Sequence, residues 1–139
     1  MDALIPDCPI CARGSPFDVL AELPSTWVTG GIDAPFPGYA CVVSKRHVAE
    51  PFELRKADQI GFWEDCMRAA RALTGLYTPR KMNYEIHGNT IPHLHMHLYP
   101  RYAGDPYEGR SITNDVRFQR SPEELARIGQ SLRQTDAPT

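Results

Sequence analysis

The chain has no segment suited to crossing a membrane or directing export. None of its uncharged apolar runs approaches the roughly 20 residues that a transmembrane helix needs. Residues 1–7 do not combine a basic stretch with a following apolar segment, as a secretory signal would. From these absences we expect a cytosolic (cytoplasmic) protein with no membrane partner.

Basic residues are not in excess. The sequence has 15 Lys and Arg residues against 17 Asp and Glu residues, which gives a formal net charge of −2. Non-specific binding to a nucleic-acid backbone requires a clustered basic surface. We therefore expect no nucleic-acid partner, and any phosphate that the protein binds should belong to a small molecule.

The chain is also too short to suggest a second domain. Its 139 residues, of which 42% are hydrophobic, are enough for one domain with one core, spanning residues 1–139. Four cysteines in such a chain favour free thiols or metal ligands over a disulfide framework.

The pattern of apolar residues predicts an α+β fold in which a long helix crosses one face of an antiparallel sheet. Apolar positions recur every three or four residues over 56–76, which indicates an amphipathic helix. Ser121, Pro122 and Glu124 match a helix start, so a short helix should run to about residue 132. We expect frayed ends at 134–139 and an N-terminal segment, 1–15, built around Cys8 and Cys11. Strands are expected at 17–23, 26–29, 39–44, 82–87 and 93–99.

Three of the five histidines stand at alternating positions, His93, His95 and His97. Successive side chains of a strand point to opposite faces, so a strand here would direct all three imidazoles to one side. The apolar residues between and after them would anchor the other side on the core. The run therefore predicts a chemical site on a rigid scaffold.

The chain resembles the histidine triad (HIT) family, whose hallmark is three histidines separated by single apolar residues. Residues 100–105 resemble the segment that follows the triad in the dinucleoside-polyphosphate-hydrolase branch. The resemblance covers most of the chain and rests on the Cys8–Cys11 pair, Pro37-Gly38, residues 45–48, Gly88-Asn89 and residues 93–101.

The resemblance implies a hydrolase or nucleotidyl transferase that cleaves at the α-phosphate through a covalent nucleotidyl-histidine. Its substrate would be a dinucleoside polyphosphate, such as a diadenosine polyphosphate, or a nucleoside phosphoramidate. His95 would be the nucleophile, with a backbone carbonyl fixing its tautomer, and His97 would lie beside the α-phosphate. No organic cofactor is expected, and magnesium should not be needed as the electrophile.

Four further residues are candidates for substrate binding. Asn89 and Thr90 stand where relatives carry an amide and a hydroxyl that contact the phosphate or leaving group, although an ordinary polar turn would look the same. Asn83 resembles an amide often found near the phosphates. Arg101 would either meet a distal phosphate or serve the structure.

Two departures from the commoner family pattern concern the nucleoside. Tyr39 follows Pro37-Gly38 where many members have a histidine, and Gly31 stands where many carry a ribose-binding carboxylate. Asp33 is near, but in a different register. The ribose contacts and the base preference are therefore not predicted.

Cys8 and Cys11 form a Cys-x-x-Cys pair that would need two more ligands to hold zinc. The resemblance supplies His47 and His93, which would complete a structural Cys2His2 site; free thiols are the alternative. Cys41 and Cys66 fall at strand and helix positions typical of packing residues.

Two other functions compete with this prediction. The three triad histidines could jointly bind a catalytic zinc, although no metal-binding carboxylate adjoins them. A nucleotide-binding regulatory or scaffold protein with little turnover would have the same pocket. The resemblance also implies a homodimer whose sheets join, with the long helix near the interface.

Overall fold

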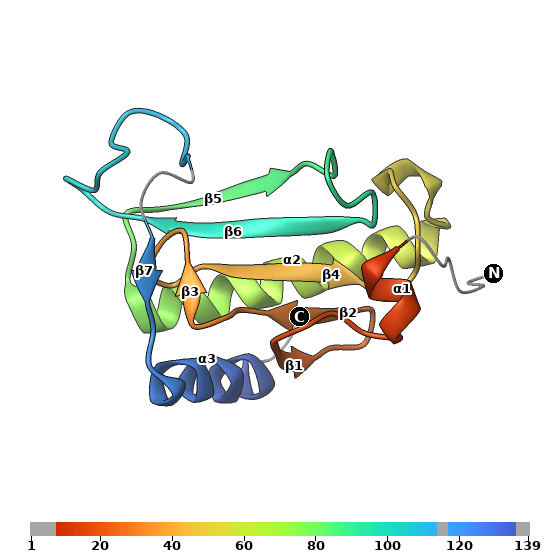
Figure 1. Ribbon diagram of the computed structural model, residues 1–139, viewed down its shortest axis with the longest axis horizontal. Helices are drawn as coiled ribbons and strands as arrows, with labels where there is room; N and C mark the ends of the chain where they lie inside the picture. Colours follow the sequence, from red (N-terminus) through yellow and green to blue (C-terminus); the bar gives the residue numbers. More distant parts are fainter. Residues whose placement is uncertain (1–7, 114–116, 136–139) are drawn as a thin grey trace.

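The computed structural model describes residues 8–113 and 117–135 and has an antiparallel five-stranded sheet at its centre (Figure 1). Its strand order is β1-β2-β4-β6-β5, so β6 lies between β4 and β5. A second sheet pairs two short strands, β3 and β7. The strands are β1 (Val19–Glu22), β2 (Thr26–Thr29), β3 (Asp33–Ala34), β4 (Ala40–Ser44), β5 (Lys81–Ile86), β6 (His95–Arg101) and β7 (Phe118–Gln119).

Helices cover one face of the main sheet. The long helix α2 (Lys56–Tyr77) crosses behind the strands and α3 (Pro122–Gln134) lies beside β1, as Figure 1 shows. The short helix α1 (Pro9–Arg13) and a 3-10 turn, η1 (Pro51–Glu53), lie at one end of the sheet. Leu94, Met96 and Leu98 are buried in the core between sheet and helices. The predicted α+β architecture is confirmed.

Most predicted elements are present. The Ser121 hydroxyl accepts a hydrogen bond from the backbone N–H of Glu124, as expected for the cap of α3. Pro122 occupies the first turn, and the helix ends at Gln134, beyond the expected 132. Of the end predicted to fray, 134–139, residues 136–139 lie outside the described residues, as do residues 1–7 of the expected N-terminal segment. Cys41 and Cys66 are buried, in agreement with a packing role.

The prediction that the triad strand begins at His93 is wrong by two residues, because β6 begins at His95. His93 belongs to the segment that leads into the strand, and its ring takes part in other contacts, described below. Sequence patterns also missed α1 and the β3–β7 pair. Two-residue strands are too short to show a period-2 pattern.

No helix within the described ranges is both long and apolar enough to cross a membrane.

Arg101, at the end of β6, holds the loop that follows the strand. Its guanidinium donates to both carboxylate oxygens of Asp105, at 3.0 and 3.1 Å, and to the side-chain oxygen of Asn83 at 2.8 Å. It also donates to the carbonyl oxygens of Tyr107 and Arg110. Hydrogen bonds from Arg101 lower the pKa of the Asp105 carboxyl to about 2.

Replacing Asp105 with asparagine should therefore destabilise the fold at neutral pH by about 2–3 kcal/mol, since a shift of about two pKa units corresponds to that free energy. The carboxylate stabilises the native state above about pH 4, and this contribution is lost as the pH falls through about 2. The free energy of unfolding, measured with urea between pH 7 and pH 2, should therefore depend less on pH in Asp105→Asn than in wild type. The control is Asp33→Asn, whose pair with Arg117 is exposed and should contribute less than about 1 kcal/mol. Equal losses of stability in Asp105→Asn and Asp33→Asn would contradict the role given to the Asp105–Arg101 pair.

Candidate functional site

Two of the triad histidines share the sheet face that the helices leave uncovered. His95 and His97 are both half-buried, and their ring centroids lie 4.9 Å apart. They pair in register with Val43 and Cys41 of β4. The intervening Met96 is buried in the core, so the alternation along β6 sets the direction of both imidazoles.

His95 has a defined tautomer. Its Nδ1 lies 2.7 Å from the backbone carbonyl oxygen of His93. A carbonyl oxygen only accepts hydrogen bonds, so Nδ1 carries the proton and donates it. The lone pair of the neutral ring is then on Nε2, the nitrogen that points away from this contact.

His97 is held as a neutral imidazole beside an aromatic cluster. Burial, together with the neighbouring His95 and His87, lowers its pKa to about 4. Its Nδ1 lies 2.8 Å from the hydroxyl of Tyr39, and its ring stacks against the rings of Tyr39 and Tyr99.

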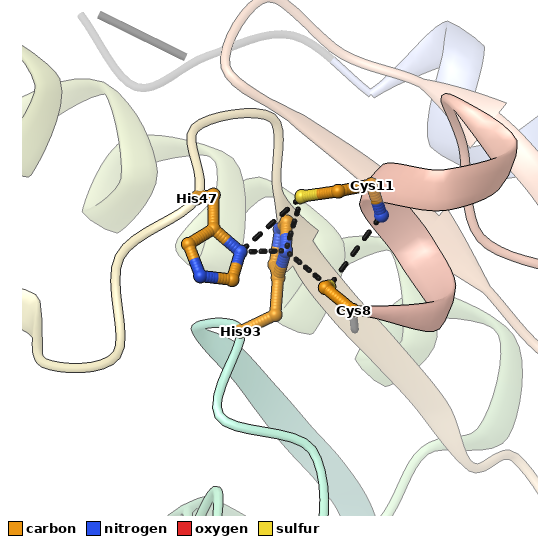
Figure 2. Close-up of side chains that lie close together, drawn as sticks. All are labelled: Cys8, Cys11, His47 and His93. Carbon is orange, nitrogen blue, oxygen red and sulfur yellow. Dashed lines mark hydrogen bonds between the residues drawn. The ribbon is translucent and has the colours of Figure 1, made fainter. Parts of the chain in front are cut away.

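His93 faces a different set of side chains. Cys8 and Cys11 from the α1 segment, His47 from the loop after β4, and His93 converge at one end of the sheet (Figure 2). Their ligand atoms all lie within 4.8 Å of one another. The Nδ1 of His93 is 3.1 Å from that of His47 and 3.5 Å from the sulfur of Cys8. The sulfur of Cys11 is 3.2 Å from Nδ1 of His47.

These distances fit the edges of a tetrahedral metal site. Zinc bonds of about 2.0–2.1 Å to nitrogen and 2.3 Å to sulfur separate neighbouring ligands by roughly 3.3–3.8 Å. The Nε2 of His93 lies 2.7 Å from the carbonyl oxygen of Ser44 and so carries the ring proton. That hydrogen bond leaves the lone pair of Nδ1 available to bind a metal. Metal-bound histidines commonly donate their other ring N–H to a backbone carbonyl in this way. Two thiols and two imidazoles form a closed set of the structural type.

The cluster separates His93 from its two triad neighbours. Among residues 8–113 and 117–135 it is the only group of three or more potential metal ligands of these types that lie close together. The structure therefore does not bring His93, His95 and His97 together as a joint metal site.

The predicted substrate-binding residues lie in two places. Asn89 and Thr90 are exposed in the turn between β5 and β6, near the start of β6. Asn83 and Arg101 meet at the other end of the β5–β6 pair and line a cavity of about 550 Å³. Arg101 donates to Asp105, Tyr107 and Arg110, so it has the structural role that the sequence analysis gave as one alternative.

Two residues near His97 escaped the sequence analysis. Glu85 pairs in register with His97, and its carboxylate lies 2.9 Å from Nε2 of His87. The His87 ring lies 5.9 Å from that of His97. The available signal was the i, i+2 spacing of Glu85 and His87 at the end of an expected strand, which puts both on one face.

Comparisons with known proteins agree with this arrangement. A family model described as HIT domain matches residues 13–104. Bis(5'-adenosyl)-triphosphatase of Dictyostelium discoideum is 26% identical over 105 residues, which is 70% of either chain.

Solved structures of histidine triad proteins share the fold. One from Bradyrhizobium japonicum has a TM-score of 0.74 and 25% identity, with 84% of this chain and 88% of that chain covered. A zinc-bound histidine triad family protein from Mycobacterium smegmatis has a TM-score of 0.68 and 23% identity, with 92% and 94% covered.

Proposed function

Because the chain belongs to the HIT domain family, we propose that it is a nucleotide hydrolase or nucleotidyl transferase that uses His95 as its nucleophile. The observation that carries the proposal is the 2.7 Å hydrogen bond from Nδ1 of His95 to the carbonyl oxygen of His93. This bond leaves the lone pair of the neutral ring on Nε2, and it supports the ring as positive charge develops during attack on phosphorus.

The reaction has two steps. Nε2 of His95 forms a bond to the α-phosphorus while the bond from phosphorus to the leaving group breaks, and the leaving group departs with the bonding electron pair and takes up a proton from solvent. Water, or another acceptor in a transferase, then attacks the phosphorus and gives up a proton to solvent, and the phosphorus–nitrogen bond breaks with its electron pair returning to Nε2 of His95. His97 lies next to His95 and is suited to hydrogen-bond an oxygen of the transferring phosphoryl group, where charge changes most.

We assign the candidate binding residues to two parts of a substrate. Asn89 and Thr90 are exposed beside the start of β6, where they would contact the phosphate or the leaving group. Asn83 pairs in register with Tyr99, two residues along β6 from His97, and it lines the same cavity as Arg101. There it would contact a part of the substrate beyond the α-phosphate, such as a further phosphate of a dinucleoside polyphosphate.

Replacing His95 with glycine should abolish the covalent intermediate while nucleotide binding and metal content persist. We would mix wild type and His95→Gly with diadenosine tetraphosphate and, separately, with adenosine 5′-phosphoramidate. Denaturation at alkaline pH preserves the phosphorus–nitrogen bond, and intact-mass spectrometry then detects an AMP adduct. An adduct on wild type alone supports the nucleophile.

Other outcomes favour the competing functions. Nucleotide binding without adduct or turnover in wild type would favour a regulatory or scaffold protein. Loss of bound metal in His95→Gly would favour a catalytic metal on the triad.

We also propose that the Cys8, Cys11, His47 and His93 cluster holds a structural zinc ion. The donor types and their separations support this assignment. The ion would cross-link the α1 segment and the loop after β4 to the start of β6. It would thereby steady the His93 backbone, whose carbonyl orients His95.

Wild type should contain about one zinc per chain by elemental mass spectrometry, and Cys8→Ser should lose most of it. Chelation should lower the free energy of unfolding of wild type by at least about 2 kcal/mol, since a bound ligand stabilises only the native state. Cys66→Ser is the control, because it alters a buried thiol outside the cluster and should keep its zinc even if stability falls. Unchanged zinc content in Cys8→Ser would exclude the site.

A homodimer is proposed from the apolar surface around the outer edge of β5. β5 is an edge strand of the described sheet, and apolar side chains nearby are unusually exposed. Trp63 of α2, Ile86 of β5 and Phe52 of η1 line one cavity of about 440 Å³. A second copy of this chain would cover both the edge and this patch, the two features that most need covering in a single chain.

Wild type should then have twice the 15.6 kDa mass of one chain in light scattering after size exclusion. Trp63→Glu should shift it to the monomer by placing a charge in the interface. Phe17→Glu, which changes an equally exposed apolar residue elsewhere, should leave the mass unchanged. A monomeric wild type at micromolar concentration would contradict the dimer.

A further inference from the structure

Tyr39 lies against the phosphate site in a way that the sequence did not anticipate. Its hydroxyl is 2.8 Å from Nδ1 of His97, and the two rings stack with centroids 5.9 Å apart. The Tyr39 side chain is half-buried, and its ring also packs against Tyr99. A buried hydroxyl that contacts only one side of an imidazole can select which ring nitrogen carries the proton.

We infer that Tyr39 is a positioning residue, whose hydroxyl donates to Nδ1 of His97 and so keeps the proton of that imidazole on Nε2. In this tautomer Nε2–H of His97 is a hydrogen-bond donor beside His95. An anionic phosphate oxygen requires a donor there, because the opposite tautomer would present a lone pair to it and repel it. The inference deepens the proposed function and rests on it for its catalytic consequence.

The direction of the hydrogen bond follows from the groups around the phenol. Burial raises the pKa of Tyr39, so the hydroxyl keeps its proton. The Cys41 thiol, whose pKa burial raises to about 12, also lies within hydrogen-bonding reach of the hydroxyl, whereas Tyr99 and Arg120 act on it through electrostatics. A phenol is the stronger donor and an imidazole nitrogen the stronger acceptor, whereas a thiol is weak in both roles. The Tyr39 hydroxyl has one proton to donate, and Nδ1 of His97, 2.8 Å away, is a better acceptor than the thiol sulfur, so the O–H points to that nitrogen.

His97 itself is neutral, which makes its tautomer decisive. Its low pKa, caused mainly by burial and then by His95 and His87, leaves a single ring proton at neutral pH. If that proton moved to Nδ1, Nε2 of His97 would change from a hydrogen-bond donor to an acceptor.

The backbone holds Tyr39 rigidly in place. Gly38, with φ of +79°, turns the chain just before it, and a Cβ there would meet Tyr77 and Pro100 at 3.0–3.1 Å. The buried Arg120 donates to the carbonyl oxygen of Tyr39 at 2.7 Å. The Pro37-Gly38 turn and Arg120 therefore fix the position from which the phenol reaches His97.

The test reads the tautomer of His97 directly, by long-range nitrogen–proton NMR of the imidazoles at neutral pH. The His97 signals are assigned by their absence from His97→Gln. Wild type should show a protonated Nε2 and an unprotonated Nδ1. Tyr39→Phe, which keeps the ring stack and removes only the hydroxyl, should shift His97 toward a mixture of tautomers. Tyr99→Phe is the matched control, since Tyr99 stacks on the same imidazole but has no described hydrogen bond to it. It should keep the wild-type pattern.

Kinetics tests the catalytic consequence. Tyr39→Phe should lower kcat for the nucleotide substrate by about 10- to 100-fold, as other losses of an orienting hydrogen bond do, with KM changed by less than about threefold. A merely structural role would reduce the active fraction and leave the tautomer unaltered.

The failures of the two proposals are distinguishable. A protonated Nδ1 of His97 in wild type overturns the role of Tyr39 without any variant, and so does an unchanged tautomer in Tyr39→Phe. Absence of turnover in wild type defeats the proposed function, while the NMR result still decides whether Tyr39 sets the tautomer.

Discussion

Strand β6 lies between β4 and β5, so backbone hydrogen bonds to a neighbour on either side fix its register and the direction of its two faces. Its apolar residues fill the face toward α2, which leaves His95 and His97 on the other. Because the core face is close-packed, neither imidazole can turn away without loss of that packing. The positions of the candidate nucleophile and of its neighbour thus depend on burial on the opposite side of the same strand.

The candidate site uses neutral groups to orient neutral imidazoles. The His93 carbonyl faces Nδ1 of His95, the Tyr39 hydroxyl faces Nδ1 of His97, and the Ser44 carbonyl faces Nε2 of His93. A carboxylate partner would raise the pKa of a histidine, and a protonated imidazole cannot attack phosphorus. The neutral partners found here instead select one tautomer, which sets the nitrogen that carries the proton and the nitrogen that carries the lone pair. Two of the three partners are backbone atoms, so the fold itself supplies much of the orientation.

The metal-site candidate and the triad meet at His93. Its side chain belongs to the Cys8, Cys11, His47 and His93 cluster, while its carbonyl orients His95. One residue therefore connects a cross-link between distant segments with the chemistry of the strand that follows. This connection gives a physical reason for a cluster of potential metal ligands so close to the candidate nucleophile.

The sequence by itself determined the α+β class, the long helix, the cap at Ser121 and the two faces of β6, because all of these follow from local periodicity and capping chemistry. Its resemblance to a known family also predicted the four potential metal ligands, Cys8, Cys11, His47 and His93. Only the tertiary structure decided that His93 precedes the strand, that Arg101 serves a loop, and that Tyr39, Glu85 and His87 surround His97. The Tyr39–His97 contact joins residues 58 positions apart in the chain, and no local pattern encodes which distant hydroxyl a given imidazole will meet.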